Sequence, residues 1–293
     1  MKFLSRLNLL IRLFFLILLC FSLNACRKTP AQITEITDQL ALENGFKKNL
    51  VNADHFTLAT YQKITNKDSR YIFYIEGDGL AFTRYGVSPN PTPTTNHILK
   101  LALMDHHDNV VYIARPCQHI DLKLVEPCSN KKYWSTDRFS QESKDIIYAA
   151  IKNILGINKK KFDLVGFSGG GAIASLITAQ HRDEVNYLIT IAANLDIVAF
   201  NDYHRVLQMP NSLNPIDFTH NIRNTRQLHL CGKKDDRVPC FIAESFVEKL
   251  NTENAEYVII DEASHNHGWG EIWENVLKWM NSNERYRPES SSL

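Results

Sequence analysis

Short apolar runs alternate with longer amphipathic segments along most of the chain. Runs rich in β-branched and aromatic residues predict strands, and segments whose apolar residues recur about every 3.6 positions predict helices. Strands are expected at residues 56–61, 71–75, 110–114, 162–167, 187–192, 227–231 and 257–260. Helices are expected at residues 96–104, 140–155, 171–179, 241–250 and 271–281.

From residue 110 onward the expected strands and helices alternate. Such alternation predicts an α/β protein with a mainly parallel sheet and helices on both faces. The first two strands are expected to pair as an antiparallel hairpin at one edge, with residues 66–68 in its turn. Catalytic groups in sheets of this kind gather at the carboxyl ends of the strands, so the residues that follow each strand are the functional candidates.

The segment after the strand at 162–167 carries the most specific motif. It reads Gly166-Phe167-Ser168-Gly169-Gly170 and lies between an apolar strand and a helix of small residues. This pattern is typical of a nucleophile elbow, in which a serine sits on a sharp strand-to-helix turn. The two outer glycines leave room for the strained backbone. Ser168 is therefore the predicted nucleophile of an acyl transfer; the alternative is a glycine-rich turn with an incidental serine.

A second glycine-rich segment follows the strand at 71–75 and reads Glu76-Gly77-Asp78-Gly79. Glycines at such a turn let backbone N–H groups face the oxygen of a reacting carbonyl. We expect one oxyanion donor at Asp78 or Gly79 and the other at Gly169, the residue after the nucleophile. The alternatives are a plain hairpin turn and, because two carboxylates are present, a metal-binding loop.

The candidate acid follows the strand at 227–231. Asp235 stands three residues after Gly232 and four before Pro239. A carboxylate at the end of a strand can orient a catalytic histidine and stabilise its charged form. Its neighbour Asp236 and the earlier Asp196 are the rival acids.

The candidate base follows the last strand. His265 lies five residues past Ile260, on a loop long enough to reach Ser168. His267, two residues further on, is a competitor. Paired histidines also suggest zinc, but no third ligand with suitable spacing accompanies them, so no metal or cofactor is expected.

The chain order Ser168, Asp235, His265 resembles that of the α/β-hydrolase fold. The resemblance covers residues 56–280 and implies an eight-stranded, mostly parallel sheet that carries a serine triad. It departs at Glu76, where a histidine is common in the oxyanion loop of esterases, and this leaves the substrate class open. A short stretch at 201–221 is the candidate cap over the site.

The first 25 residues have the features of a signal peptide. Three basic residues precede an uncharged run at 13–23, which is too short to span a bilayer comfortably. The run ends in Leu23-Asn24-Ala25-Cys26, which resembles the bacterial lipobox. We expect lipidation of Cys26, with fatty acids such as palmitate as the anchor. An ordinary signal peptide or an uncleaved anchor is the alternative, and Cys20 is a poorer site because Leu19 precedes it.

The remaining chain divides into a lipidated tether and lead-in at 26–45, a hydrolase domain at 46–282 and a polar tail at 283–293. Without residues 1–25 the chain keeps 30 of its 33 basic residues against 32 acidic ones. This balance of charges excludes the large excess of positive charge that is typical of nucleic-acid-binding proteins. Because Arg27 follows the lipobox where a retention aspartate would stand, we expect an outer-membrane lipoprotein of the bacterial envelope that faces the periplasm.

Four further cysteines occur in two pairs that are close in sequence. Outside the cytoplasm an even number of cysteines predicts disulfides. Four cysteines allow three pairings, and we expect the local one, Cys117–Cys128 and Cys231–Cys240; the alternative is buried free thiols. No pair has the Cys-x-x-Cys spacing of a zinc or redox site.

Together these features predict a serine hydrolase that acts on an ester or a related acyl bond of a small-molecule or peptide substrate. A peptidase of the same fold is the first alternative. Such peptidases often carry an additional propeller or cap domain, which the sequence does not suggest. The second alternative is an envelope protein that uses the fold to bind a partner without catalysis.

Overall fold

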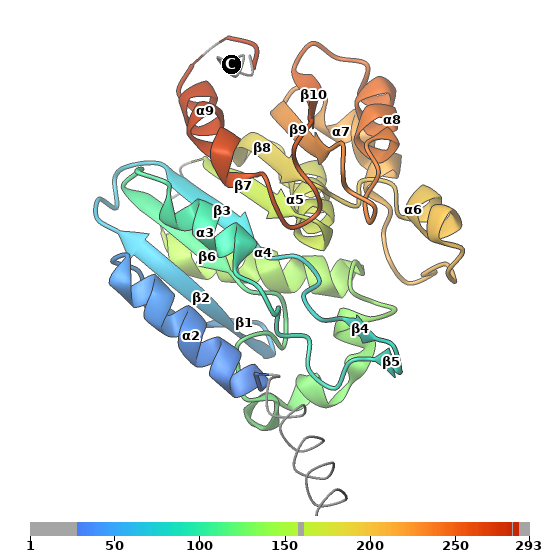
Figure 1. Ribbon diagram of the computed structural model, residues 1–293. Helices are drawn as coiled ribbons and strands as arrows, with labels where there is room; N and C mark the ends of the chain where they lie inside the picture. Colours follow the sequence, from blue (N-terminus) through green and yellow to red (C-terminus); the bar gives the residue numbers. More distant parts are fainter. Residues whose placement is uncertain (1–27, 158–160, 283, 287–293) are drawn as a thin grey trace, which may run out of the picture.

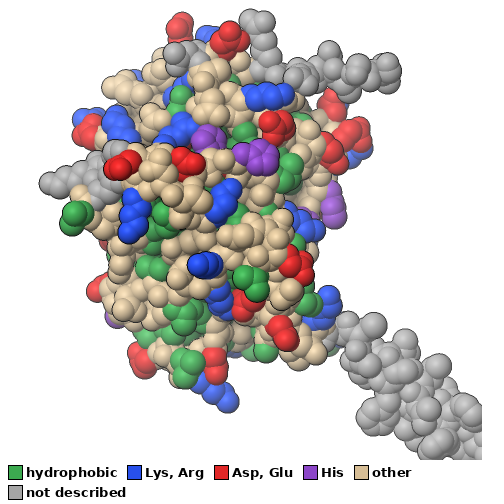
Figure 2. Space-filling view, turned by 90° about the vertical axis from the view of Figure 1, so that its left-hand side faces the viewer, with side chains coloured by type: hydrophobic (Ala, Val, Ile, Leu, Met, Phe, Trp, Pro, Cys, Tyr) green, Lys and Arg blue, Asp and Glu red, His purple; other side chains and the backbone are tan. Residues whose placement is uncertain are grey.

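The computed structural model describes residues 28–157, 161–282 and 284–286 (Figure 1). The predicted signal peptide, the lipidation candidate Cys26 and most of the predicted tail lie outside the described residues. Within the described ranges, no helix is both long enough and apolar enough to cross a membrane. On the face drawn in Figure 2, acidic and basic side chains are interspersed rather than gathered into a field of one sign.

An eight-stranded sheet runs through the centre of the molecule. Its strand order is β1-β2-β6-β3-β7-β8-β9-β10. The strands are β1 (Lys47–Ala53), β2 (Phe56–Ile64), β3 (Tyr71–Ile75), β6 (Asn109–Ile113), β7 (Phe162–Phe167), β8 (Val185–Ile191), β9 (Arg226–Gly232) and β10 (Ala255–Ile260). β2 is antiparallel to both β1 and β6, and all the other neighbours are parallel. This is the predicted α/β-hydrolase sheet, mostly parallel with an antiparallel N-terminal edge.

The predicted hairpin between the strands at 56–61 and 71–75 is wrong. β6 lies between β2 and β3 in the sheet, and β2 instead forms a hairpin with β1. Asp54 in the connecting turn has a positive φ of 57°. β1 is an edge strand with two lysines and two asparagines, and most of its residues are at least partly exposed. Polar side chains suit a strand at the edge of a sheet. They also leave β1 without the apolar run by which the sequence predicts a strand.

Helices cover both faces of the sheet (Figure 1). One apolar layer includes residues of α2 (Pro30–Glu43), α3 (His97–Leu103) and α9 (Gly270–Met280). The other includes residues of α4 (Gln141–Leu155), α5 (Gly169–Gln180) and α8 (Phe241–Leu250). All residues of β3, β6 and β7 are buried, as expected for strands covered on both sides.

Most predicted elements occur within a few residues of their expected positions. β7 and α8 match their predicted bounds, and Ser140 caps the start of α4, where its side chain accepts a hydrogen bond from the Ser143 N–H. Helix α2 was not predicted: it begins within the lead-in at 26–45, where Thr29 and Gln32 form a capping box. The candidate cap contains the end of α6 (Ile197–His204), a loop, and α7 (Thr219–Ile222).

Both disulfides are present in the predicted pairing. Cys117 is bonded to Cys128, and Cys231 is bonded to Cys240. The first pair lies on the segment that follows β6, and the second encloses the segment that follows β9. Both bridges therefore lie at the carboxyl end of the sheet, where the candidate functional residues gather.

Candidate active site

Ser168 lies on the tight turn between β7 and α5. Its backbone has φ 52° and ψ −121°, a strained combination for a residue with a side chain. A Cβ on Gly166 would lie 2.5 Å from the Gly170 carbonyl oxygen, and one on Gly170 would lie 2.3 Å from the Ile75 carbonyl oxygen. Both positions therefore require glycine, and the geometry matches the predicted nucleophile elbow.

Asp235 and His265 meet at the ends of β9 and β10. The Asp235 Oδ2 atom lies 2.9 Å from His265 Nδ1. The other carboxylate oxygen accepts hydrogen bonds from the backbone N–H groups of Arg237 and Val238, at 2.8 and 2.9 Å. The His265 carbonyl accepts a bond from Trp269 Nε1 at 3.1 Å. His265 is thus fixed at one ring nitrogen by a buried carboxylate and at its backbone carbonyl by a tryptophan.

The rival acids and the rival base lie elsewhere. Asp236 is exposed, whereas Asp235 is buried. Asp196 caps helix α6, where its carboxylate accepts a bond from the Ala199 N–H. His267 is exposed and packs its ring against His97, with ring centroids 5.5 Å apart.

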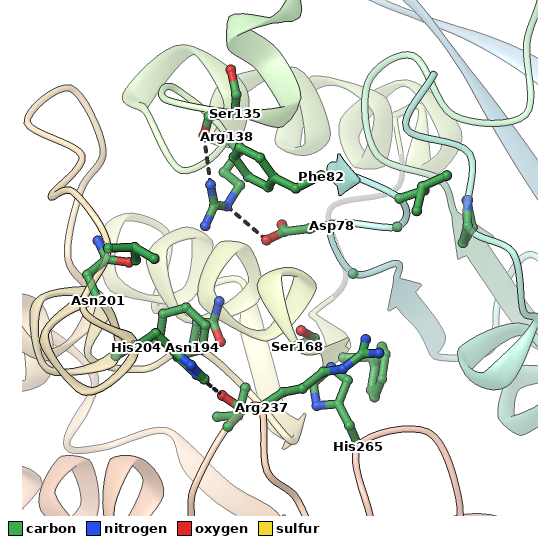
Figure 3. Close-up of a pocket in the computed structure, with 18 of the residues that line it drawn as sticks. Asp78, Phe82, Ser135, Arg138, Ser168, Asn194, Asn201, His204, Arg237 and His265 are labelled. Carbon is green, nitrogen blue, oxygen red and sulfur yellow. Dashed lines mark hydrogen bonds and ion pairs between the residues drawn. The ribbon is translucent and has the colours of Figure 1, made fainter. Parts of the chain in front are cut away.

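Ser168 and His265 line the same pocket (Figure 3). Among the described residues, no hydrogen bond joins the Ser168 hydroxyl to the imidazole. Such bonds are often long without substrate and shorten when substrate binds. The Phe167 ring packs 5.1 Å from the His265 ring, so the residue before the serine also helps to hold the histidine.

The predicted oxyanion loop, residues 76–79, follows β3 and contacts the elbow. Gly79 has a positive φ of 61°, and a Cβ there would lie 2.1 Å from the Pro91 carbonyl oxygen. A Cβ on Gly169 would lie 2.0 Å from Asp78 Oδ1, so the side chain of Asp78 rests on Gly169. In the described part of the chain, the backbone N–H groups of Asp78, Gly79 and Gly169 donate no hydrogen bond to protein. They therefore remain the candidate oxyanion donors that the sequence predicts.

The sequence did not reveal the two arginines that hold Asp78. Arg138 Nε lies 2.8 Å from Asp78 Oδ2, and Arg115 Nη1 lies 3.4 Å from Oδ1. Arg115 directly follows a predicted strand, so its place at the carboxyl end of the sheet was a usable signal. Arg138 precedes a helix on the far side of the pocket, and no sequence pattern connects it with Asp78.

Glu76 is buried at the base of the oxyanion loop. It accepts hydrogen bonds at 2.8 Å from the Tyr112 hydroxyl and from the Gly77 N–H. Burial raises the pKa of the Glu76 carboxyl to about 7, and the two hydrogen bonds and the nearby Arg115 charge oppose this rise. Glu76 therefore supports the loop from within at the position where esterases commonly have histidine.

A pocket of about 870 Å³ opens around Ser168 and His265. This volume is within the range of small-molecule sites. Most of its apolar lining comes from two regions, the segment around β4 (Phe82–Thr83) and the stretch formed by α6 and the candidate cap, and the rest comes from the segments at the ends of β7 and β9. The apolar side chains are Leu80, Phe82, Pro93, Phe167, Phe200, Val206, Leu207, Met209 and Val238. Asn194 also lines the pocket; it is 3% exposed, and its Oδ1 atom lacks a hydrogen-bond partner among the described residues.

The metal-loop alternative for residues 76–79 gains no support from the arrangement of side chains. Asp78 is paired with two arginines, and Glu76 is bonded to a tyrosine. Across the described residues, no group of three or more His, Cys, Asp and Glu side chains is arranged to hold a metal ion.

The chain is similar to a known protein family and to solved structures of one fold. The family model described as the prolyl oligopeptidase family matches residues 137–286, about half of the chain. This segment includes the elbow and the Asp235 and His265 loops. No curated protein is significantly similar to the chain in sequence.

Solved structures with the same fold include esterases and a peptidase. Est1E from Butyrivibrio proteoclasticus has a TM-score of 0.58 and 16% identity, over 80% of this chain and 97% of that one. The Pyrococcus furiosus esterase Pf2001 has a TM-score of 0.60 and 14% identity, over 82% and 94%. The Pyrococcus horikoshii acylaminoacyl peptidase has a TM-score of 0.59 and 13% identity, over 85% of this chain but 42% of that one. At these identities the likeness establishes the fold.

Proposed function

The chain belongs to the prolyl oligopeptidase family and is a serine hydrolase with the α/β-hydrolase fold, and we propose that it cleaves an ester or a related acyl bond through a triad of Ser168, Asp235 and His265. One observation carries the proposal. A buried carboxylate holds His265 at 2.9 Å, and this histidine lines the same pocket as a serine on a strained, glycine-flanked turn.

The proposed reaction has two steps. Ser168 Oγ attacks the acyl carbonyl while His265 Nε2 takes the hydroxyl proton, and this proton then passes to the leaving alcohol or amine. A water molecule next attacks the acyl-enzyme, again with His265 as base, and releases the acid and free Ser168. Asp235 keeps the proton of the imidazole on Nδ1 and stabilises the imidazolium. No cofactor takes part in these steps.

Backbone donors stabilise the tetrahedral intermediates in this scheme. The N–H of Gly169 and that of Asp78 or Gly79 bind the oxygen that becomes negative during attack. The N-terminus of helix α5 lies behind the serine and favours negative charge there. This assignment rests on the absence of protein partners for those N–H groups within the described residues.

An ester is the preferred substrate because the pocket wall is largely apolar and the Pyrococcus furiosus esterase Pf2001 has the same fold. A peptidase activity is the second candidate, and membership of the prolyl oligopeptidase family favours it.

Purified protein that starts at Cys26 is assayed on p-nitrophenyl esters of increasing acyl length and on aminoacyl p-nitroanilides. Hydrolysis of esters that is lost in Ser168→Ala supports the proposal. Turnover of anilides alone favours the peptidase, and turnover of neither class favours a binding protein.

We further propose that Cys26 carries a lipid that attaches the enzyme to the outer membrane, with the domain facing the periplasm. The lipobox-like sequence and the uncharged run before it support this proposal. Cys26→Ser is expected to abolish labelling by a fatty-acid probe and to leave the precursor uncleaved. Unchanged labelling of the Cys26→Ser variant refutes the assignment.

A further inference from the structure

Asp78 contributes two different groups to the oxyanion loop, its backbone N–H and its carboxylate. Its backbone N–H is free to meet a carbonyl oxygen, while its carboxylate points toward Arg138 (Figure 3) and also pairs with Arg115. Arg138 approaches from the loop before α4, and Arg115 approaches from the segment after β6. These two segments and the oxyanion loop itself thus meet at the Asp78 carboxylate.

The two arginines are themselves fixed. Arg115 is 3% exposed, and its Nη2 donates to the carbonyl oxygen of Arg138. Arg138 is 8% exposed, and its Nη1 donates to the carbonyl of Ser135 at 2.9 Å. Both guanidinium groups lie near the Phe139 ring, at 5.7 and 5.0 Å from its centroid. Side chains held in this way give the Asp78 carboxylate little freedom to move.

The Asp78 carboxylate also lies directly against the nucleophile elbow. A Cβ on Gly169 would lie 2.0 Å from Asp78 Oδ1 and 2.6 Å from Cγ, so the carboxylate occupies the space that a side chain at Gly169 would need. The carboxylate therefore joins the two segments that supply the oxyanion donors. Movement of the oxyanion loop relative to the elbow would have to break this contact.

The charges explain why a carboxylate is tolerated so close to a developing oxyanion. An unpaired carboxylate in the partly buried position of Asp78 would be costly and would repel the negative oxygen. The positive charges of the two arginines exceed the single negative charge of the Asp78 carboxylate. Although burial lowers the pKa of the Arg115 guanidinium to about 10, it remains positively charged at neutral pH.

The segment that carries Arg115 is tied to the oxyanion loop a second time. Gln118 Nε2 donates to the Gly77 carbonyl at 3.0 Å, and Gln118 Oε1 accepts from the Arg115 N–H at 2.9 Å. Cys117, which lies between these residues, is bonded to Cys128. The disulfide therefore restrains the segment that supports the oxyanion loop.

We propose that Arg115, with Arg138, acts through the Asp78 carboxylate as a positioning residue that holds the N–H donors of Asp78 and Gly169 in register for the transition state. The inference rests on the proposed function, because it assigns a role within that oxyanion site. It makes no use of substrate contacts by Arg115, which does not line the pocket.

Arg115→Met tests the proposal, with Arg70→Met as the matched control. Arg70 pairs at 3.2 Å with the buried Asp163 in β7, away from the pocket, so its loss likewise removes an arginine from a carboxylate, but not from one beside the oxyanion loop. Arg115→Met is expected to lower kcat roughly 100-fold, as for loss of one oxyanion donor, with KM changed less than about threefold. An alkyl boronic acid, which mimics the tetrahedral intermediate, should bind more weakly by a similar factor. Arg70→Met should lower the melting temperature and leave kcat unchanged.

A second substitution separates charge from structure. Once Arg115 is gone, Arg138 alone balances the Asp78 carboxylate, and the surplus positive charge near the oxyanion is lost. Asp78→Asn in the Arg115→Met background removes the negative charge and should recover part of kcat. A purely structural role for Arg115 predicts no recovery. Where Arg115→Met does not fold, Arg138→Gln serves in its place, with boronate affinity and kcat as the paired readouts.

Each outcome separates this inference from the proposed function. Unchanged kcat in a folded Arg115→Met, or an equal loss in Arg70→Met, overturns the inference and leaves the triad intact. Failure to recover with Asp78→Asn overturns the charge argument. Absence of hydrolysis by the unsubstituted enzyme, with Ser168 unreactive toward a fluorophosphonate, overturns the proposed function and this inference with it.

Discussion

At the scale of single residues, the account depends on which histidine and which aspartate serve Ser168. The buried pair Asp235 and His265 has the geometry of an acid and a base, while His267 is exposed. His265→Ala is expected to reduce kcat about 10⁴-fold or more, because the base and the proton donor are lost together. His267→Ala should have a far smaller effect. Initial rates on the best ester measure both, and a severe loss in His267→Ala alone would reassign the base.

The aspartates give a parallel prediction. Asp235→Asn removes the charge that fixes the imidazole tautomer, so it should be much more damaging to kcat than Asp236→Asn. Asp196→Asn should change kcat and the melting temperature little, because Asp196 only caps helix α6 and asparagine caps a helix equally well. Rates and thermal unfolding of the three variants are compared. A greater loss of kcat in Asp236→Asn or Asp196→Asn than in Asp235→Asn contradicts the assignment.

Glu76 gives a prediction about pH. Its pKa is raised by burial from 4.5 to about 7, so the folded state holds the proton more tightly than the unfolded chain. The resulting stabilisation is fully present below pH 4.5 and is lost as the pH rises through about 7. Burial also raises the pKa of Asp163, to about 6, so it acts in the same direction.

Glu76→Gln should therefore flatten the decline of the free energy of unfolding between pH 4.5 and pH 7, because glutamine keeps the shape and does not titrate. Urea unfolding at a series of pH values measures this decline. Asp163→Asn should flatten it over a lower range and leave the Glu76 contribution. Identical slopes in Glu76→Gln and the unsubstituted protein would show that the Glu76 carboxyl titrates normally.

At the scale of elements, the carboxyl ends of the strands bring the site together. The acid segment after β9 is closed by the disulfide between Cys231 and Cys240, and Asp235 lies midway along it. Replacing both cysteines with serine should lower the free energy of unfolding by about 2–4 kcal/mol. It should also lower kcat, by roughly 10- to 100-fold, because the carboxylate and the histidine it holds lose their alignment. Activity is measured well below the melting temperature of the variant. A kcat equal to that of the disulfide-bonded protein would show that the bridge serves stability alone.

Elements also show what the sequence could and could not predict. The elbow was predictable because a strand, two obligatory glycines and a helix follow one another within a few residues. The partner of β2 was not, since the polar edge strand β1 carries no apolar run and the intervening β6 comes later in the chain. The link between Asp78 and Arg138 was equally hidden, because it joins loops 60 positions apart through a single ion pair.

At the scale of the whole molecule, the parallel part of the sheet and the two helical layers follow from the alternation of strands and helices in the sequence. The triad residues come from segments spread over nearly 100 positions, and the parallel strands bring their ends to one edge of the sheet. The assignment of the enzyme to the bacterial envelope rests on the N-terminal sequence alone.

The most direct test of the central claim is the mass of the protein after reaction with a fluorophosphonate. The account predicts one adduct per chain, found on the peptide that contains Ser168. The adduct should be absent in Ser168→Ala, strongly slowed in His265→Ala and formed normally in His267→Ala. No adduct on the folded protein, or an adduct on a residue other than Ser168, would contradict the account.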